Sequence, residues 1–256
     1  MFTRPPIPHP RYGQRIFRRR IRLLADGDTV RGGLEDNLHA CRLALRHDGH
    51  EITAIDAEWL RYPTLVCPDS VARLMRLAGR PLTADRAGFR GWENPRSHCT
   101  HLHDLLGLAI AQALRGTAER QYDVTIPDPH DGSTVAEVAL DGHVLHRWRI
   151  DHPRILEPAE LAGREVLRGF AAWSAERWSG DELEAAAVLQ MGLIIGTSQR
   201  WDLAAMRRRA PHEPLSSRER ASVCFAYEDE RFDLALPRVD SVRDFTDSPD
   251  ALVTFL

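Results

Sequence analysis

The sequence predicts an α+β protein, in which an antiparallel β-meander covered by helices is followed by a second β-hairpin and a helical C-terminal part. Alternating apolar residues with Asp-Gly turn signals extend from Phe17 to Asp56. Apolar residues at three- and four-residue spacing follow between residues 68 and 113, which is typical of helices that cover a sheet. Two further segments with apolar residues at alternate positions lie on either side of Asp141-Gly142 and predict a hairpin.

Composition excludes several classes of protein before any motif is considered. The chain has 256 residues, of which 43% are apolar and 28% are charged, as in average soluble globular proteins. All 34 basic residues are arginines, so lysine chemistry such as a Schiff base is excluded. They oppose 37 acidic residues for a net charge of −3, which predicts no nucleic-acid partner. There is no run of 18 apolar residues and no apolar core of a signal peptide, so we expect no membrane partner and a cytoplasmic protein.

The N-terminal residues predict an extended arm over 1–16. This segment is rich in proline, which cannot donate the hydrogen bonds of a sheet: Pro5, Pro6, Pro8 and Pro10. After the arm we expect an α+β domain over 17–118 and a hairpin with a helical region over 119–256. The basic run Arg15–Arg22 alternates with apolar residues, and we interpret it as an edge strand with a solvated face.

The meander is predicted to contain three strands. They centre on residues 21–23, 38–45 and 50–55, each of which is apolar at alternate positions. Asp26-Gly27-Asp28 follows the first strand, and Asp48-Gly49 joins the last two as a tight turn.

Two helices are predicted next. Pro68 and Asp69 open a pattern that ends at Gly79, a typical glycine stop. Ser97 begins the second, whose apolar side chains at 3–4 spacing indicate a core helix.

The second half predicts strands and then helices. Residues 122–126 and the pair 134–140 and 143–150 alternate, and Asp141-Gly142 supplies a hairpin turn. Amphipathic patterns over 160–178 and 181–195 are separated by Ser179-Gly180, where glycine ends one helix and the next can begin.

The densest set of metal-capable side chains lies at the start of the second predicted helix. The motif S-H-C-T-H-L-H-D contains His98, Cys99, His101, His103 and Asp104. A helix N-terminus carries positive potential, which predicts a lowered pKa for the Cys99 thiol. Cys99 and His103 are one turn apart on a helix, whereas His98, Cys99 and His101 converge if the first turn is irregular. Both arrangements remain open.

Other ligands can come from distant parts of the chain. Cys67 precedes the first predicted helix, and His39 begins the middle strand. Asp36 can orient His39 from behind through a hydrogen bond to its imidazole. His101, where it does not bind a metal, can exchange protons near neutral pH.

The order of elements between residues 34 and 116 resembles the U-type iron-sulfur cluster scaffold proteins. In that family a cysteine precedes a helix and a His-Cys pair opens the next, and here these positions hold Cys67 and the pair His98-Cys99. The family's first cysteine falls near Asn37 and its aspartate near His39, so a three-thiolate site is absent. The resemblance then implies a mixed site of His39, Cys67, Cys99 and one more histidine, which suits Zn or mononuclear Fe.

Nearly the whole chain is also similar to a bacterial family described as domain of unknown function 2889. The matching stretches are L-E-D-N-L-H, R-Y-P-T-L-V-C-P, C-T-H-L-H-D-L and S-V-R-D-F-T-D-S-P-D-A-L. The family motif C-T-H-L points to Cys99 and His101 rather than His98.

These residues together predict a metal-dependent enzyme, a lyase or hydrolase acting on a small organic molecule. Zn or Fe is expected at a site of His39, Cys67, His98 and Cys99, with His101 and Asp36 in catalytic roles. Trp59 and Trp92 flank these residues in sequence and suit an aromatic substrate. The alternative is a non-enzymatic carrier or scaffold for a metal or an iron-sulfur cluster. The sequence is also compatible with a homodimer.

Overall fold

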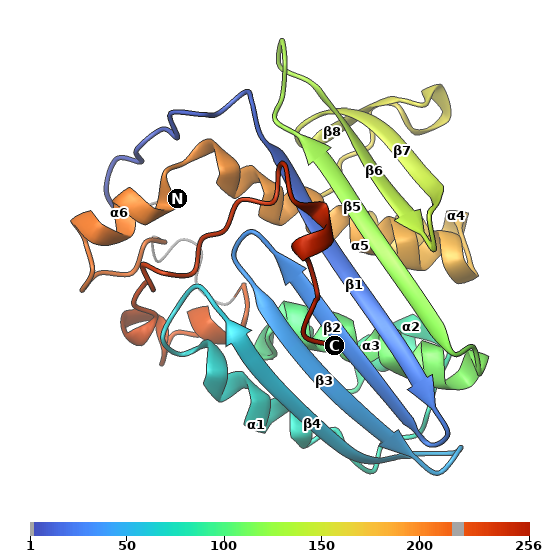
Figure 1. Ribbon diagram of the computed structural model, residues 1–256. Coiled ribbons are helices and arrows are strands. Elements are labelled where there is room, and N and C mark those ends of the chain that lie inside the picture. Colours follow the sequence, from blue (N-terminus) through green and yellow to red (C-terminus); the bar gives the residue numbers. More distant parts are fainter. Residues whose placement is uncertain (1–2, 217–222) are drawn as a thin grey trace.

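One antiparallel sheet dominates the computed structural model, which describes residues 3–216 and 223–256 (Figure 1). Within these residues the sheet has eight strands in the order β4-β3-β2-β1-β5-β6-β7-β8. The strands are β1 (Ile16–Asp26), β2 (Thr29–Asp36), β3 (Ala40–His47), β4 (Ile52–Arg61), β5 (Glu119–Pro127), β6 (Thr134–Leu140), β7 (His143–Asp151) and β8 (Arg154–Glu157). The predicted α+β class is therefore confirmed.

Helices cover one face of this sheet. The α-helices of the described chain are α1 (Ser70–Met75), α2 (Arg86–Gly91), α3 (Thr100–Arg115), α4 (Phe170–Arg177), α5 (Gly180–Gly196) and α6 (Leu203–Arg209). The two longest lie on the same side of the sheet, α3 against β1–β3 and α5 against β5–β7 (Figure 1). The core lies between these two helices and the sheet, because the apolar residues of each strand alternate toward them.

The central strand corrects one prediction. β1 pairs with both β2 and β5, so the interpretation of Arg15–Arg22 as an edge strand is wrong. Alternating arginines indicate a strand with one solvated face, which is equally true of a central strand in an antiparallel sheet. On the solvated face, Arg20 pairs with Asp123 of β5 at 2.6 Å.

The turns follow the predicted chemistry. Gly27, Gly49 and Gly142 all have positive φ at the hairpins between β1 and β2, between β3 and β4, and between β6 and β7. The meander has four strands rather than three: the predicted segments fall in β1, β3 and β4, and β2 was missed between the Gly27 turn and β3.

Two helix starts also differ from the sequence prediction. α3 begins at Thr100 rather than Ser97, because residues 95–97 form a separate 3-10 turn capped by the Asn94 side chain. α4 begins at Phe170 rather than residue 160, because Gly163 and Gly169 adopt positive φ and interrupt the helical pattern. α5 agrees with the predicted helix over 181–195 to within one residue at each end.

The two halves of the chain share the same plan. Each contributes a four-stranded meander followed by helices that include one long helix on the covered face. The predicted boundary at 118 falls in the connection between α3 and β5, while the pairing of β1 with β5 joins both halves into one sheet.

The ends of the chain lie on different parts of the molecule. The N-terminal arm runs beside the segment that leads into α6, where His9 N donates to Arg200 O at 3.0 Å. The C-terminal tail crosses the uncovered face of the sheet over β1 and β2 (Figure 1). Gly33 permits this close approach, since a Cβ there would lie 2.8 Å from Val253 Cγ1.

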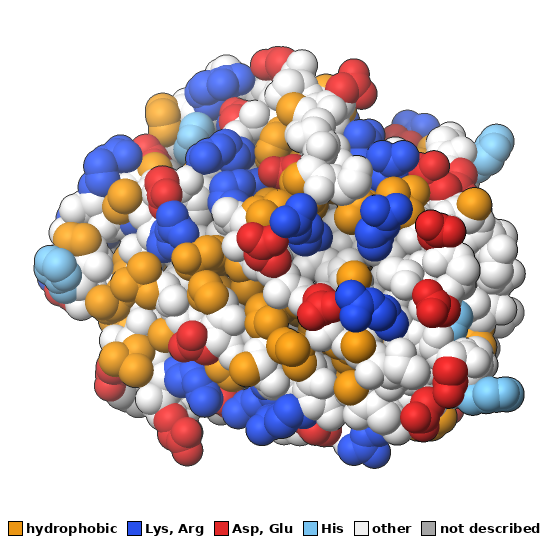
Figure 2. Space-filling model, turned by 60° about the horizontal axis from the view of Figure 1, so that its bottom comes forward, with side chains coloured by type: hydrophobic (Ala, Val, Ile, Leu, Met, Phe, Trp, Pro, Cys, Tyr) orange, Lys and Arg blue, Asp and Glu red, His pale blue; other side chains and the backbone are white. Residues whose placement is uncertain are grey.

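The outer surface agrees with the small net charge. Figure 2 shows basic and acidic side chains interspersed over one side of the molecule, with apolar side chains between them. Among the described helices, none combines the length and apolar character required to cross a bilayer.

Gly192 tests the packing of α5 against the sheet. A Cβ at Gly192 would lie 2.8 Å from Val124 Cγ1, and Val124 is a buried, β-branched residue of β5 that has no room to move. We expect Gly192→Ala to lower the free energy of unfolding by about 1–3 kcal/mol, measured by denaturant titration. Gly91→Ala is the matched control, since its Cβ meets nothing within 4 Å; equal stability of the two variants would contradict this packing.

Candidate metal centre

Three buried side chains meet where β2 ends and α3 begins. Asp36 is the last residue of β2, His39 precedes β3, and His101 lies in the first turn of α3. One potential ligand atom from each lies within 4.8 Å of the other two, and within residues 3–216 and 223–256 this is the one such group of three. We call Asp36, His39 and His101 the Asp-His-His group.

The turn between β2 and β3 is shaped by the Asp36 carboxylate. Its Oδ1 accepts hydrogen bonds from Leu38 N at 2.8 Å and His39 N at 2.9 Å, which is an Asx-type turn. Arg61, the last residue of β4, stabilises the same turn by donating a hydrogen bond to Asp36 O at 2.7 Å. The sequence E-D-N-L-H therefore folds so that the His39 ring returns to the carboxylate, with Nδ1 at 2.9 Å from Oδ1.

His101 approaches the group from the helix layer. Its ring stacks on that of His39 with centroids 3.8 Å apart and an interplanar angle of 27°. Its Nε2 is buried and has no hydrogen-bond partner, and its Nδ1 lies 3.9 Å from Cys99 Sγ. A buried ring nitrogen without a partner is unfavourable by itself, so the site suits an additional group that takes its lone pair.

Arg19 balances the charge of the carboxylate. Its NH1 lies 3.1 Å from Asp36 Oδ2, and both side chains are almost completely buried. Burial alone would raise the pKa of Asp36, but the adjacent His39 and Arg19 outweigh it and hold that pKa far below its ordinary value. Asp36 is therefore an anion at any physiological pH.

Burial raises the pKa of an acid such as Asp36, but it lowers the pKa of the nearby histidines. It lowers the pKa of His101 well below the ordinary value, and the neighbouring His39 and Arg19 lower it further. Burial also lowers the pKa of His103 to about 4. Both rings are consequently neutral near pH 7, the form in which an imidazole binds a metal.

The structure brings Asp36, His39 and His101 together, and Cys99 lies beside His101 but outside that group. Asp36 contacts His39 as the sequence predicts, and it also belongs to the group itself. Cys99 is the N-cap residue of α3, but the expected lowering of its pKa is wrong, because complete burial raises that pKa well above its ordinary value.

Two other predicted ligands, Cys67 and His98, make different contacts. Cys67 Sγ lies 3.1 Å from Thr64 Oγ1, and burial raises the pKa of this thiol to about 11. His98 Nε2 contacts Glu93 at 2.9 Å, and its ring lies 5.1 Å from that of His103. Neither residue belongs to the Asp-His-His group.

Of the two tryptophans predicted to flank the site, one lies beside it. The Trp59 ring is 6.0 Å from that of His39 and 6.3 Å from that of His101. Trp92 instead packs edge-on against Phe89 at 5.2 Å. Trp59 thus provides an aromatic wall next to the two imidazoles.

The corresponding place in the second half of the chain has different chemistry. There the first turns of α5 meet β5, and the Tyr122 hydroxyl donates to Glu184 at 2.6 Å and accepts from Arg120 Nε at 3.0 Å. Tyr122 is fully buried and paired on both sides. Within the described residues, the group of potential metal ligands thus belongs to the first half.

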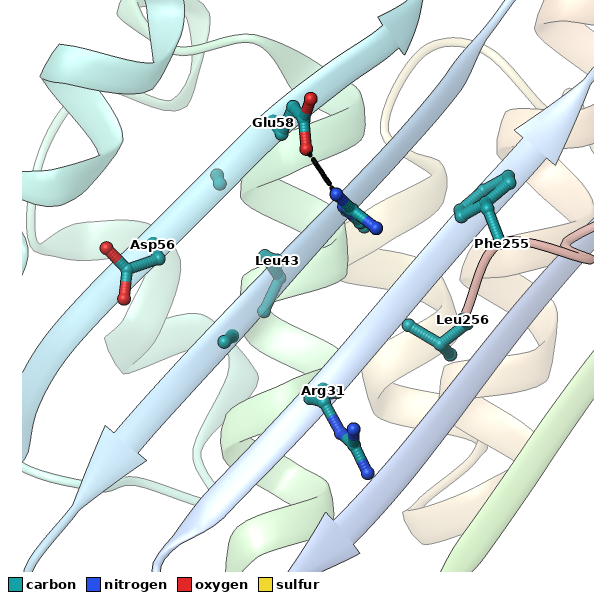
Figure 3. Close-up of a pocket in the computed structure, with 9 residues that line it drawn as sticks. Arg31, Leu43, Asp56, Glu58, Phe255 and Leu256 are labelled. Carbon is teal, nitrogen blue, oxygen red and sulfur yellow. Dashed lines mark hydrogen bonds and ion pairs between the residues drawn. The ribbon is translucent and has the colours of Figure 1, made fainter.

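The cavity of about 420 Å³ on the uncovered face of the sheet is separate from this group. Figure 3 shows its lining, with Arg31, Leu43 and Glu58 on the strands and Phe255 and Leu256 of the C-terminal tail beside them. The Asp-His-His group lies on the helix side of the same sheet, where His101 belongs to α3.

Sequence reasoning missed Arg19 as the partner of Asp36. The signal was its position, because Phe17, Arg19 and Ile21 alternate on one side of the strand, so that Arg19 falls on the apolar side. An arginine on that side requires a buried anion.

Comparisons with known proteins add no family. No protein-family model matches the chain, and a search of curated proteins gives no match. The two family resemblances therefore stay predictions that depend on the motifs quoted for them.

The buried Arg19–Asp36 pair should contribute strongly to the stability of the fold. We expect Arg19→Met to destabilise the fold by about 3–5 kcal/mol, because it leaves a buried carboxylate without its cation. Chemical unfolding measures the loss. Adding Asp36→Asn to Arg19→Met should recover part of it, whereas a single variant as stable as the parent chain would show that the pair contributes little.

The lowered histidine pKa values predict acid sensitivity. A group whose pKa is lower in the folded state stabilises the fold above its unfolded pKa, near 6.5 for histidine, and this contribution is lost as pH falls toward the folded value, about 4 for His103. We expect stability to fall between about pH 6.5 and 4, and His103→Gln to reduce that slope in unfolding titrations. An unchanged slope in His103→Gln would contradict the assignment.

Proposed function

We propose that this protein is a metal-dependent enzyme that acts on a small organic substrate by lyase or hydrolase chemistry. The observation that carries the proposal is the Asp-His-His group, in which two stacked imidazoles and a buried carboxylate lie within 4.8 Å of one another. Two histidines with one carboxylate form a donor set that suits Zn²⁺ or Fe²⁺.

The charges of the site indicate a fourth ligand. Arg19 already neutralises Asp36, so a divalent cation bound by Asp36 and two neutral imidazoles would leave a buried excess of positive charge. Cys99 Sγ, 3.9 Å from His101 Nδ1, can supply the missing anion. Metal coordination deprotonates a thiol that burial otherwise keeps neutral.

The surrounding residues have defined roles in such a site. Asp36 fixes the tautomer and orientation of His39, and Arg61 keeps the turn that carries both. The near-complete burial of His39 and His101 excludes bulk water and strengthens electrostatic interactions. A bound Zn²⁺ or Fe²⁺ supplies Lewis-acid polarisation of a substrate oxygen.

Trp59 favours an aromatic substrate. Its ring is the aromatic surface nearest to the two imidazoles, and its indole Nε1 donates to Ser70 Oγ at 3.3 Å, which holds the ring in place. A planar substrate placed against it would have its polar atoms toward His39 and His101.

The alternative function is a carrier of a metal or an iron-sulfur cluster. It depends on Cys67 and Cys99 sharing one ion, whereas the group of potential ligands within 4.8 Å of one another does not include Cys67, which favours the enzyme. Cys67→Ser discriminates the two functions, since it should retain the metal in the proposed site and lose it in a carrier.

Metal analysis tests the proposal directly. We expect about one Zn or Fe per chain in tag-free protein purified without chelator, by elemental mass spectrometry, and a large loss of it in His39→Ala and His101→Ala. His50→Ala, at an exposed turn residue, is the control and should keep the metal. Full metal content in both site variants, or none in the parent chain after Zn and Fe supplementation, would refute the site.

A further inference from the structure

A second cavity, of about 240 Å³, lies between α2, α3, α4 and α5 on the helix side of the sheet. Its polar lining includes Arg86 and Arg90 of α2 and Asp104 of α3. The rest of the lining is mainly apolar and includes Leu167, Phe170, Met191 and Ile194. Its volume is below the range of drug-sized pockets and suits a compact ligand.

Among the described residues, neither arginine side chain has a partner within hydrogen-bond distance. Arg86 NH2 lies 3.9 Å and Arg90 NH1 3.6 Å from the same oxygen of Asp104, which is too far for a hydrogen bond. By contrast, Arg20 contacts Asp123 at 2.6 Å on the uncovered face. Two guanidinium groups thus share one distant carboxylate, and the cavity has an excess of positive charge.

Because these charged side chains are partly buried, water only partly screens the excess positive charge of the cavity. The side chains of Arg86 and Arg90 are 23% and 38% exposed, and that of Asp104 is 16% exposed. An anion between them would be shielded from water on several sides while it accepts charge-assisted hydrogen bonds. The planar guanidinium geometry matches a carboxylate through paired N–H donors.

The apolar lining indicates what the rest of the ligand is. Leu167 is 44% exposed at the rim of the cavity, although it is large and apolar. Phe170 and Ile194 extend the apolar surface inward, and a fully hydrated inorganic anion would leave this surface uncovered.

We infer that this cavity binds a small carboxylic acid with a compact apolar body, its carboxylate held by Arg86 and Arg90. The inference is independent of the proposed metal site, because no member of the Asp-His-His group lines the cavity. Asp104 and His101 are three residues apart on α3. A ligand in the cavity would therefore lie about one helical turn from the Asp-His-His group.

Calorimetric titration with 3-phenylpropanoate tests the inference, with the neutral 3-phenylpropan-1-ol as its matched probe. A chelator is present throughout, so that a carboxylate bound to a metal at His39 and His101 gives no signal. We expect the acid to bind about tenfold or more tightly than the alcohol, and the Arg86→Gln/Arg90→Gln variant to lose about the same factor.

Two variants control this experiment. Arg96→Gln removes an exposed arginine of the same region and should leave binding unchanged. Ala187→Leu fills the cavity from α5 and should weaken binding while both arginines remain. Circular-dichroism melting establishes that each variant is folded.

Four outcomes would overturn the inference: no binding of the acid at millimolar concentration, equal binding of the alcohol, undiminished binding by the folded double variant, or equally tight binding of inorganic phosphate. The last would show a charge site without a role for the apolar lining.

Discussion

The buried ion pair between Arg19 and Asp36 connects the fold to the candidate site. Arg19 lies on β1, the strand that joins the two halves of the sheet, and Asp36 ends β2 beside it. A guanidinium and a carboxylate with almost no exposure are tolerated only when each compensates the other. The same carboxylate shapes the turn to β3 and holds the His39 ring, so the geometry of the site depends on the pairing of the central strands.

Adjacent acidic residues at the end of β2, Glu35 and Asp36, point to opposite faces of the sheet and make different contacts. Asp36 faces the helices and the imidazoles, whereas Glu35 pairs with Arg61 at 2.9 Å and accepts from Val253 N at 2.8 Å. The C-terminal tail is thereby anchored behind the site, on the other side of the sheet. Arg61 joins both, because it also donates to the backbone of Asp36.

The neutrality of the candidate site has chemical consequences. With Asp36 balanced by Arg19, burial keeps His101 neutral and Cys99 protonated near pH 7. Both are then suited to receive a cation, and the thiol releases its proton on binding it. In the second half of the chain the Tyr122 hydroxyl, which lies at the corresponding place, is paired on both sides. The same plan thus holds a group of potential metal ligands in one half and a hydrogen-bonded tyrosine in the other.

The α+β class, the Asp-Gly hairpins and the residues of the site were accessible from the sequence, because alternation, turn residues and helix starts are local properties. The sequence also indicated His39, Cys99 and His101 as metal-capable and Asp36 as the partner of His39. Only the tertiary structure decided that β1 is central, that Arg19 compensates Asp36, and that Cys67 and His98 turn toward Thr64 and Glu93. Strand order and the choice among neighbouring histidines depend on contacts between residues far apart in the chain, and burial at those contacts reversed the expected shift in the pKa of Cys99.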